Sequence, residues 1–123
     1  MYTEIKTFED ACKALSLDVA TVIPDFSGYP PKHQAAQIAH SKLVIIAEAL
    51  NGGWAPDWDN NNEYKYYPYF DMEKGFSYYR CRCGINCANS STGSRLCFKN
   101  RELAQYAAEK FLTLYKQYFT YSK

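Results

Sequence analysis

A break at Asn51-Gly52-Gly53 divides this 123-residue chain into two halves with different hydrophobic patterns. Before the break, apolar residues recur every three or four positions, which is the spacing of an amphipathic helix. After the break, tyrosines and phenylalanines crowd into short runs that favour strands. Because this length suits one domain of about 100–150 residues, we expect a single domain over residues 1–123. Its helical half would cover residues 1–53, and a sheet plus a C-terminal helix would cover residues 54–123.

The helical half is predicted to hold two helices. Thr7 should cap a short helix that ends near Leu15, because a threonine followed by acidic residues is typical of a helix N-terminus. Pro30-Pro31 opens a longer helix, since proline suits the first helical position. The apolar stripe of this second helix runs to Gly52, where glycine provides a C-terminal stop. We expect the second helix to lie at the centre of the core.

The second half is predicted to hold three strands and a final helix. The tyrosine-rich run from residue 64 to residue 70 and the run from residue 76 to residue 83 flank a hairpin turn at Gly75. Pro68 makes the first run an edge strand or gives it a bulge, because proline cannot donate a ladder hydrogen bond. A third short strand is expected over residues 95–99. The predicted fold is α+β, in the order α-α-β-β-β-α, with a small three-stranded antiparallel sheet packed against helices and one sheet face left open.

Positive charge is concentrated in the second half. Residues 74–101 contain six Lys and Arg and no Asp or Glu, although the net charge of the chain is only +1. Alternation along a strand would place Arg80 and Arg82 on one face together with Phe76 and Tyr78. The candidate ligand-binding or partner-binding residues are these cations and the neighbouring rings: Arg80, Arg82, Arg95, Lys99, Tyr78, Phe76, Tyr67 and Tyr69.

A basic surface with interleaved rings suits a phosphate-bearing ligand that also carries a flat base. Cations neutralise phosphate, and aromatic rings stack on bases. Arginine adds paired hydrogen bonds to each phosphate. The alternative interpretation is that these residues form the solvated outer face of a half-buried sheet, with the tyrosines shielding the core.

Four of the five cysteines lie close together in the basic segment: Cys81, Cys83, Cys87 and Cys97. Zinc needs four nitrogen or sulfur ligands, often in two close pairs, and this spacing matches no common zinc motif. Cationic surroundings would lower the thiol pKa values, so a structural metal and a redox role stay as alternatives to incidental thiols. The odd cysteine count and the lack of a recognisable signal peptide predict reduced thiols. No cofactor is expected.

Signs of catalysis are few. The only histidines are His33 and His40, and none of the common nucleophile or phosphate-loop motifs is present. Asp57 and Asp59 flank Trp58 in a loop, where carboxylates usually cap turns. No apolar run approaches the roughly 20 residues that span a bilayer, so no membrane partner is expected. We therefore expect a binding protein and not an enzyme.

Several blocks of the chain carry a resemblance to known proteins. They are residues 43–51, Gly53-Trp54 with Pro56-Asp57-Trp58, residues 64–70, residues 94–99 and Glu102-Leu103-Ala104. Together they resemble a family of small, uncharacterised phage and prophage proteins of gut Bacteroidota. The resemblance implies a viral or mobile-element origin and action in the cytoplasm of the host bacterium. It carries over no catalytic residue, and Cys81, Cys83 and Cys87 fall outside its pattern.

Three functions are compatible with these features. The first is a non-enzymatic phage accessory protein that binds and inhibits or sequesters a host factor or a nucleotide signal, as an antagonist of host defence. The second is a nucleic-acid-binding module in phage replication or recombination, and the third is a virion structural or assembly component. We rank the first ahead of the second because dedicated nucleic-acid binders are usually more basic than this chain. The tyrosine-rich face would also suit a homodimer, since tyrosine and arginine are enriched at protein contacts.

Overall fold

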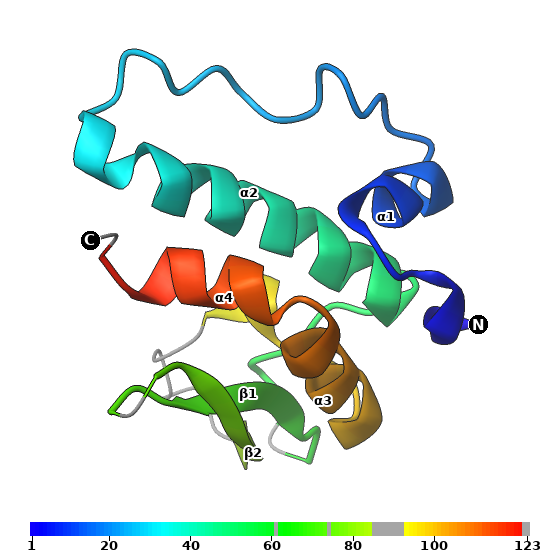
Figure 1. Ribbon diagram of the computed structural model, residues 1–123. Coiled ribbons are helices and arrows are strands. Elements are labelled where there is room, and N and C mark those ends of the chain that lie inside the picture. The colour runs from blue at the N-terminus through cyan, green and yellow to red at the C-terminus, as the bar shows by residue number, and fades with distance from the viewer. Residues whose placement is uncertain (61, 74, 85–92, 122–123) are drawn as a thin grey trace.

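The structure, a computed structural model, describes residues 1–60, 62–73, 75–84 and 93–121, and for residues 79–84 it describes the backbone alone. Within these residues the chain has four α-helices and an antiparallel pair of strands, so the mixed α+β class is confirmed. In Figure 1, α4 lies between α2 and the hairpin, and α3 lies beside the hairpin. The elements are the 3₁₀ turn η1 (Tyr2–Glu4), α1 (Phe8–Ala14), α2 (Pro31–Asn51), β1 (Lys65–Asp71), β2 (Ser77–Gly84), the 3₁₀ turn η2 (Ser94–Leu96), α3 (Arg101–Lys110) and α4 (Leu112–Phe119).

Helix α2 begins and ends where its sequence predicts. Pro31 occupies the first helical position, and Gly52 ends the helix with φ 58, a left-handed conformation that favours glycine. The Gly52 N–H donates to the carbonyls of Glu48 and Ala49. The buried face of α2 packs against α1 and α4, which confirms its central place in the core.

Helix α1 is short and is fixed by a capping box. The Asp10 N–H donates to Thr7 Oγ1 at 3.1 Å, and Asp10 Oδ2 accepts from the Thr7 N–H at 3.1 Å. The Lys6 N–H also donates to this carboxylate, and these hydrogen bonds lower the pKa of Asp10. The buried face of α1 contains Phe8 and Cys12 and packs on α2, as the helical spacing predicts.

The prediction of one C-terminal helix is wrong, because the helix breaks at Phe111. The backbone of Phe111 leaves helical geometry (φ −116, ψ 31), and the chain continues as α4 in a new direction. After the break Tyr115 is buried, while Leu114 and Tyr118, which continue the helical spacing of apolar residues from α3, are only half-buried. The change of direction at Phe111 allows α4 to pack against α2 while α3 packs against the hairpin.

The third strand predicted over residues 95–99 is also wrong. Ser94–Leu96 forms a 3₁₀ turn. In the described residues, the segment 95–99 pairs with β1 only at the bridge between Tyr66 and Phe98. The next pair would set residue 96 opposite Pro68, which has no N–H to donate. In the other direction Asn100 already caps α3, since its side chain accepts from the Leu103 N–H at 2.9 Å. The ladder is therefore stopped at both ends.

The hairpin register contains a bulge that changes which residues share a face. Phe70 lies opposite Tyr78, but Tyr69 lies opposite Arg80, so residue 79 is the extra residue of β2. Tyr78 and Arg80 therefore pair with neighbouring residues of β1, which point to opposite faces. The prediction that Phe76 and Tyr78 share a face with Arg80 and Arg82 is wrong for this reason.

Candidate functional site

The candidate site is the face of the hairpin that is turned away from α3 and α4. On the inner face, Phe70 packs against Tyr115 with 4.9 Å between ring centroids. Lys65, Tyr67 and Tyr69 alternate with the inner residues and define the outer face. Their exposure rises along the strand, from 1% for Lys65, through a half-buried Tyr67, to 44% for Tyr69.

The strand register brings arginine positions to this outer face. Arg82 lies opposite Tyr67, and Arg80 lies opposite Tyr69. Residues directly opposite each other in an antiparallel pair lie on the same face. The side chains of Arg80 and Arg82 lie outside the described part of the structure, so their contacts with a ligand stay a prediction.

The other predicted site residues lie elsewhere. Phe76 and Tyr78 are on the inner face, with ring centroids 4.6 Å and 6.5 Å from that of Phe70. Arg95 is exposed on η2, where it borders a hollow of about 500 Å³ beside Trp54. Lys99 lies at the end of α2, because a β-carbon built on Gly52 would come within 3.9 Å of Lys99 Nζ. A cation at this position interacts favourably with the negative end of the helix dipole. Because Arg95 lies beside Trp54 and Lys99 lies beside Gly52, the two cations do not converge on one site.

A buried lysine stands at one end of the outer face. Lys65 Nζ donates to the Asn60 carbonyl at 3.0 Å and lies 3.5 Å from Glu63 Oε1. It also lies 5.1 Å from the centre of the Trp58 ring. A buried charge is costly unless it is paired and hydrogen-bonded, and these three neighbours supply both. The sequence analysis did not single out Glu63, although the pair Glu63 and Lys65 at the start of an aromatic strand was a signal.

Glu63 organises the loop that precedes β1. Its Oε2 accepts from Trp54 Nε1 at 3.2 Å, and its Oε1 accepts from the Asp57 N–H at 2.8 Å. Trp58 is fixed as well, because its Nε1 donates to Ser94 Oγ. The half-buried Trp58 ring is therefore held over Lys65, at the start of the strand that carries Tyr67 and Tyr69.

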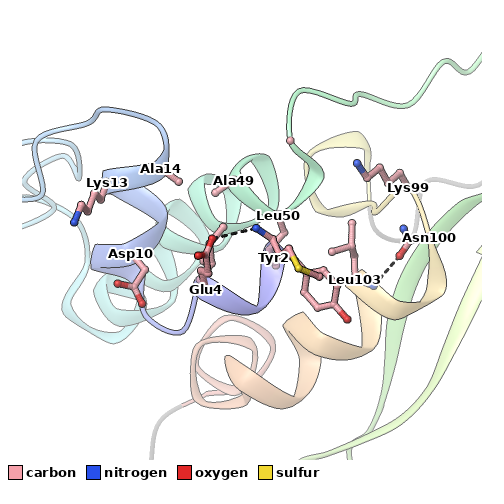
Figure 2. A pocket seen from close by; sticks show the side chains of 13 residues that line it. Tyr2, Glu4, Asp10, Lys13, Ala14, Ala49, Leu50, Lys99, Asn100 and Leu103 are labelled. Carbon is pink, nitrogen blue, oxygen red and sulfur yellow. Dashed lines mark hydrogen bonds and ion pairs between the residues drawn. The ribbon is translucent and has the colours of Figure 1, made fainter.

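A larger hollow, of about 800 Å³, lies between η1, α1, the end of α2 and the start of α3. Figure 2 shows Glu4 and Asp10 on one side of it and Lys99 and Asn100 on the other. These polar groups have structural tasks: Glu4 binds the N-terminal amine at 3.0 Å, Asp10 caps α1, and Asn100 caps α3. The hollow therefore offers a mixed-charge surface with no paired base and nucleophile among the residues that line it.

The described cysteines are poor metal ligands. Cys97 is buried, and burial raises its pKa to about 11 although Lys65 acts in the opposite direction. The expectation that cationic surroundings lower the thiol pKa is therefore wrong for Cys97. Cys81, Cys83 and Cys87 lie outside the described side chains. Within the described residues, no group of three His, Cys, Asp or Glu is placed to hold a metal ion.

The two histidines belong to aromatic contacts at the packing of α2 with the C-terminal segment. His40 stacks on Tyr118 with 4.7 Å between ring centroids, and His33 lies 5.8 Å from Tyr121. Burial lowers the pKa of His40 below its ordinary value. His40 is therefore a packing residue that favours its neutral form.

This burial predicts a pH dependence of stability. The unfolded chain takes up the His40 proton more readily than the folded chain, so the free energy of unfolding should be highest above pH of about 6.5. It should fall as the pH drops through that value towards the lower folded-state pKa. Urea unfolding at several pH values checks this, with His40→Gln expected to flatten the dependence. His33→Gln is the matched control, and an unchanged pH dependence in His40→Gln would contradict the assignment.

Comparisons with known proteins add no relative. No protein-family model matches the chain, and neither curated proteins nor solved structures give a significant match. Among the helices of the described residues, none combines the length and the apolar character needed to cross a membrane.

Proposed function

We propose that this chain is a non-enzymatic binding protein whose outer hairpin face recognises an anionic ligand that carries a flat base, either a nucleic acid or a nucleotide. The observation that carries the proposal is the strand register. It sets Tyr67 opposite Arg82 and Tyr69 opposite Arg80 on the face turned away from the helices. Alternating rings and cations on one face supply stacking and phosphate neutralisation together.

The residues of such a face supply two separate contributions to binding. Stacking of a base on an aromatic side chain contributes about 1–3 kcal/mol. Arginine forms paired, charge-assisted hydrogen bonds with phosphate oxygens. Residues 74–101 contain no carboxylate that would compete for these cations within the segment.

The proposed setting is a phage or prophage, with action in the cytoplasm of the host bacterium, as the sequence resemblance implies. A nucleotide bound on this face would be sequestered from a host signalling system, which is how an antagonist of host defence would act. A nucleic acid bound there would instead support a role in replication or recombination. A nucleotide and a nucleic acid differ in the number of phosphates that the protein neutralises, so the salt dependence of binding distinguishes the two ligands.

The double substitution Arg80→Ala with Arg82→Ala is the direct test of the proposal. We expect weaker binding of labelled oligonucleotides. The slope of log affinity against log salt should also become smaller, by about 0.7 for each single-strand phosphate that the protein no longer neutralises. Fluorescence anisotropy between about 50 mM and about 200 mM salt measures both quantities. Nucleotides are titrated in parallel as competitors.

The matched control removes two exposed cations from the helices, through Lys110→Ala with Lys116→Ala. Because it lowers the net charge equally, it should leave binding and slope close to those of the unmodified protein. If the unmodified protein binds neither nucleic acids nor nucleotides at low salt, the proposal is wrong. Equal losses of affinity in the two double variants would also contradict it, since binding would then follow net charge alone.

A further inference from the structure

We infer that the ligand of the outer face is single-stranded nucleic acid, and that Trp58 joins Tyr67 and Tyr69 in a row of three stacking positions. The inference rests on the proposed function, and it goes further by naming the form of the nucleic acid and a stacking residue from outside the hairpin.

The row follows from the geometry of β1. Lys65, Tyr67 and Tyr69 occupy successive positions on one face, and such positions are about 6.6–6.8 Å apart. Lys65 is covered by the Trp58 ring, whose centre lies 5.1 Å from Lys65 Nζ. Trp58 therefore takes the place that a third aromatic side chain would have at residue 65. Its indole N–H is held by Ser94, which fixes the orientation of the ring.

The spacing of the row favours a single strand over a duplex. Bases in one strand of B-form DNA rise by about 3.4 Å, which is half the distance between neighbouring rings of the row. A two-stranded ribbon fits the major groove, but readout there depends on polar side chains that meet base edges. Rings at alternate positions instead suit an unstacked strand, whose bases are separated and can each lie on one ring.

Charge limits the length of the row. Arg80 and Arg82 lie opposite its two tyrosines, and Arg95 follows the serine that holds Trp58. At the Trp58 end, Asp57 and Asp59 flank the tryptophan in the sequence, and both are exposed.

At the other end, Asp71 and Glu73 are exposed at the hairpin turn. Phosphates are repelled at both ends of the row, so the expected footprint is about three nucleotides, one for each ring.

The fluorescence of Trp58 provides the test. The chain has two tryptophans, so Trp54→Phe leaves Trp58 as the single tryptophan, which is excited at a wavelength that tyrosine does not absorb. Circular dichroism verifies that this variant is folded. It is titrated with oligothymidylates of one, three and six nucleotides and with a duplex. We expect single strands to quench Trp58. Affinity should rise from one to three nucleotides, change little at six after correction for the number of sites, and be at least about tenfold weaker for the duplex.

A second variant keeps the inference testable if the tryptophan loop tolerates no change. Tyr69→Ala removes an exposed ring at the far end of the row and should weaken trinucleotide binding by about tenfold. Tyr121→Ala, which removes a more exposed ring near the C-terminus, is the matched control and should leave binding unchanged. The salt dependence of the Tyr69→Ala variant should match that of the unmodified protein, because every cation is still present.

The outcomes separate the inference from the proposed function. Binding without quenching of Trp58, equal affinity for the duplex, or a mononucleotide bound as tightly as the trinucleotide would overturn the inference and leave an anion-binding face in place. Failure of every nucleic acid and nucleotide to bind would overturn the proposed function itself.

Discussion

Replacing Asn51 by alanine is expected to lower the free energy of unfolding by about 2–6 kcal/mol. The Asn51 side chain is 5% exposed, and it joins the end of α2 to the segment after η2. Its Nδ2 donates to the Cys97 carbonyl at 2.9 Å, and its Oδ1 accepts from the Lys99 N–H at 3.1 Å. Alanine would leave two largely enclosed backbone groups without partners, and each such group costs about 1–3 kcal/mol.

Urea denaturation followed by circular dichroism measures this effect. The matched control is Asn100→Ala, which removes the N-cap of α3 and should cost only about 1 kcal/mol. The Asn51 variant should therefore unfold at a clearly lower urea concentration than the Asn100 variant. If Asn51→Ala is no less stable than Asn100→Ala, the side chain does not link α2 to the segment around Phe98.

Lys65→Ala is the second substitution with a large expected effect, at about 3–5 kcal/mol of destabilisation. It leaves Glu63 without its cation, removes a hydrogen bond from the Asn60 carbonyl and empties the space beneath Trp58. Lys65→Met keeps most of the volume and should cost less. The double variant Lys65→Met with Glu63→Gln should recover part of the stability, because a buried ion pair is often replaceable by neutral groups.

A double-mutant cycle on Lys65 and Glu63, measured by chemical denaturation, gives their interaction energy. Lys110→Met removes an exposed lysine from α3 and is the control for loss of charge alone, with an expected change within about 0.5 kcal/mol. A similarly small change for Lys65→Ala would show that the contacts among Trp58, Glu63 and Lys65 do not support the fold.

The helical half was predictable because its signals are local. The Thr7 cap, the Pro31 start and the Gly52 stop each act within a few residues, and each lies where the sequence predicts. The break at Phe111 was not predicted, because α4 turns to pack against α2, which is distant in sequence. A helical repeat of apolar residues continues across the break and gives no sign of it.

The sheet was predictable only in part, for a similar reason. The hairpin follows from its aromatic runs and from Gly75. Whether residues 95–99 form a third strand depends instead on where Phe98 meets Tyr66, because that register sets Pro68 and the Asn100 cap at the two ends of the ladder. The bulge at Tyr69 and Phe70 reassigns the faces of β2, and alternation alone cannot reveal it. The candidate site therefore keeps Tyr67, Tyr69, Arg80 and Arg82 as neighbours, loses Phe76 and Tyr78 to the core, and gains Trp58.

If the outer face of the hairpin binds nucleic acid as proposed, an NMR titration will locate the ligand there. The ¹⁵N-labelled protein is titrated with a short oligothymidylate while backbone amide and indole N–H shifts are followed. We predict that the largest changes fall on residues 65–69, on residues 79–82 and on the Trp58 indole. Changes centred instead on the hollow of Figure 2, at residues such as Tyr2, Leu50 and Leu103, or no changes at all, would contradict binding at the hairpin.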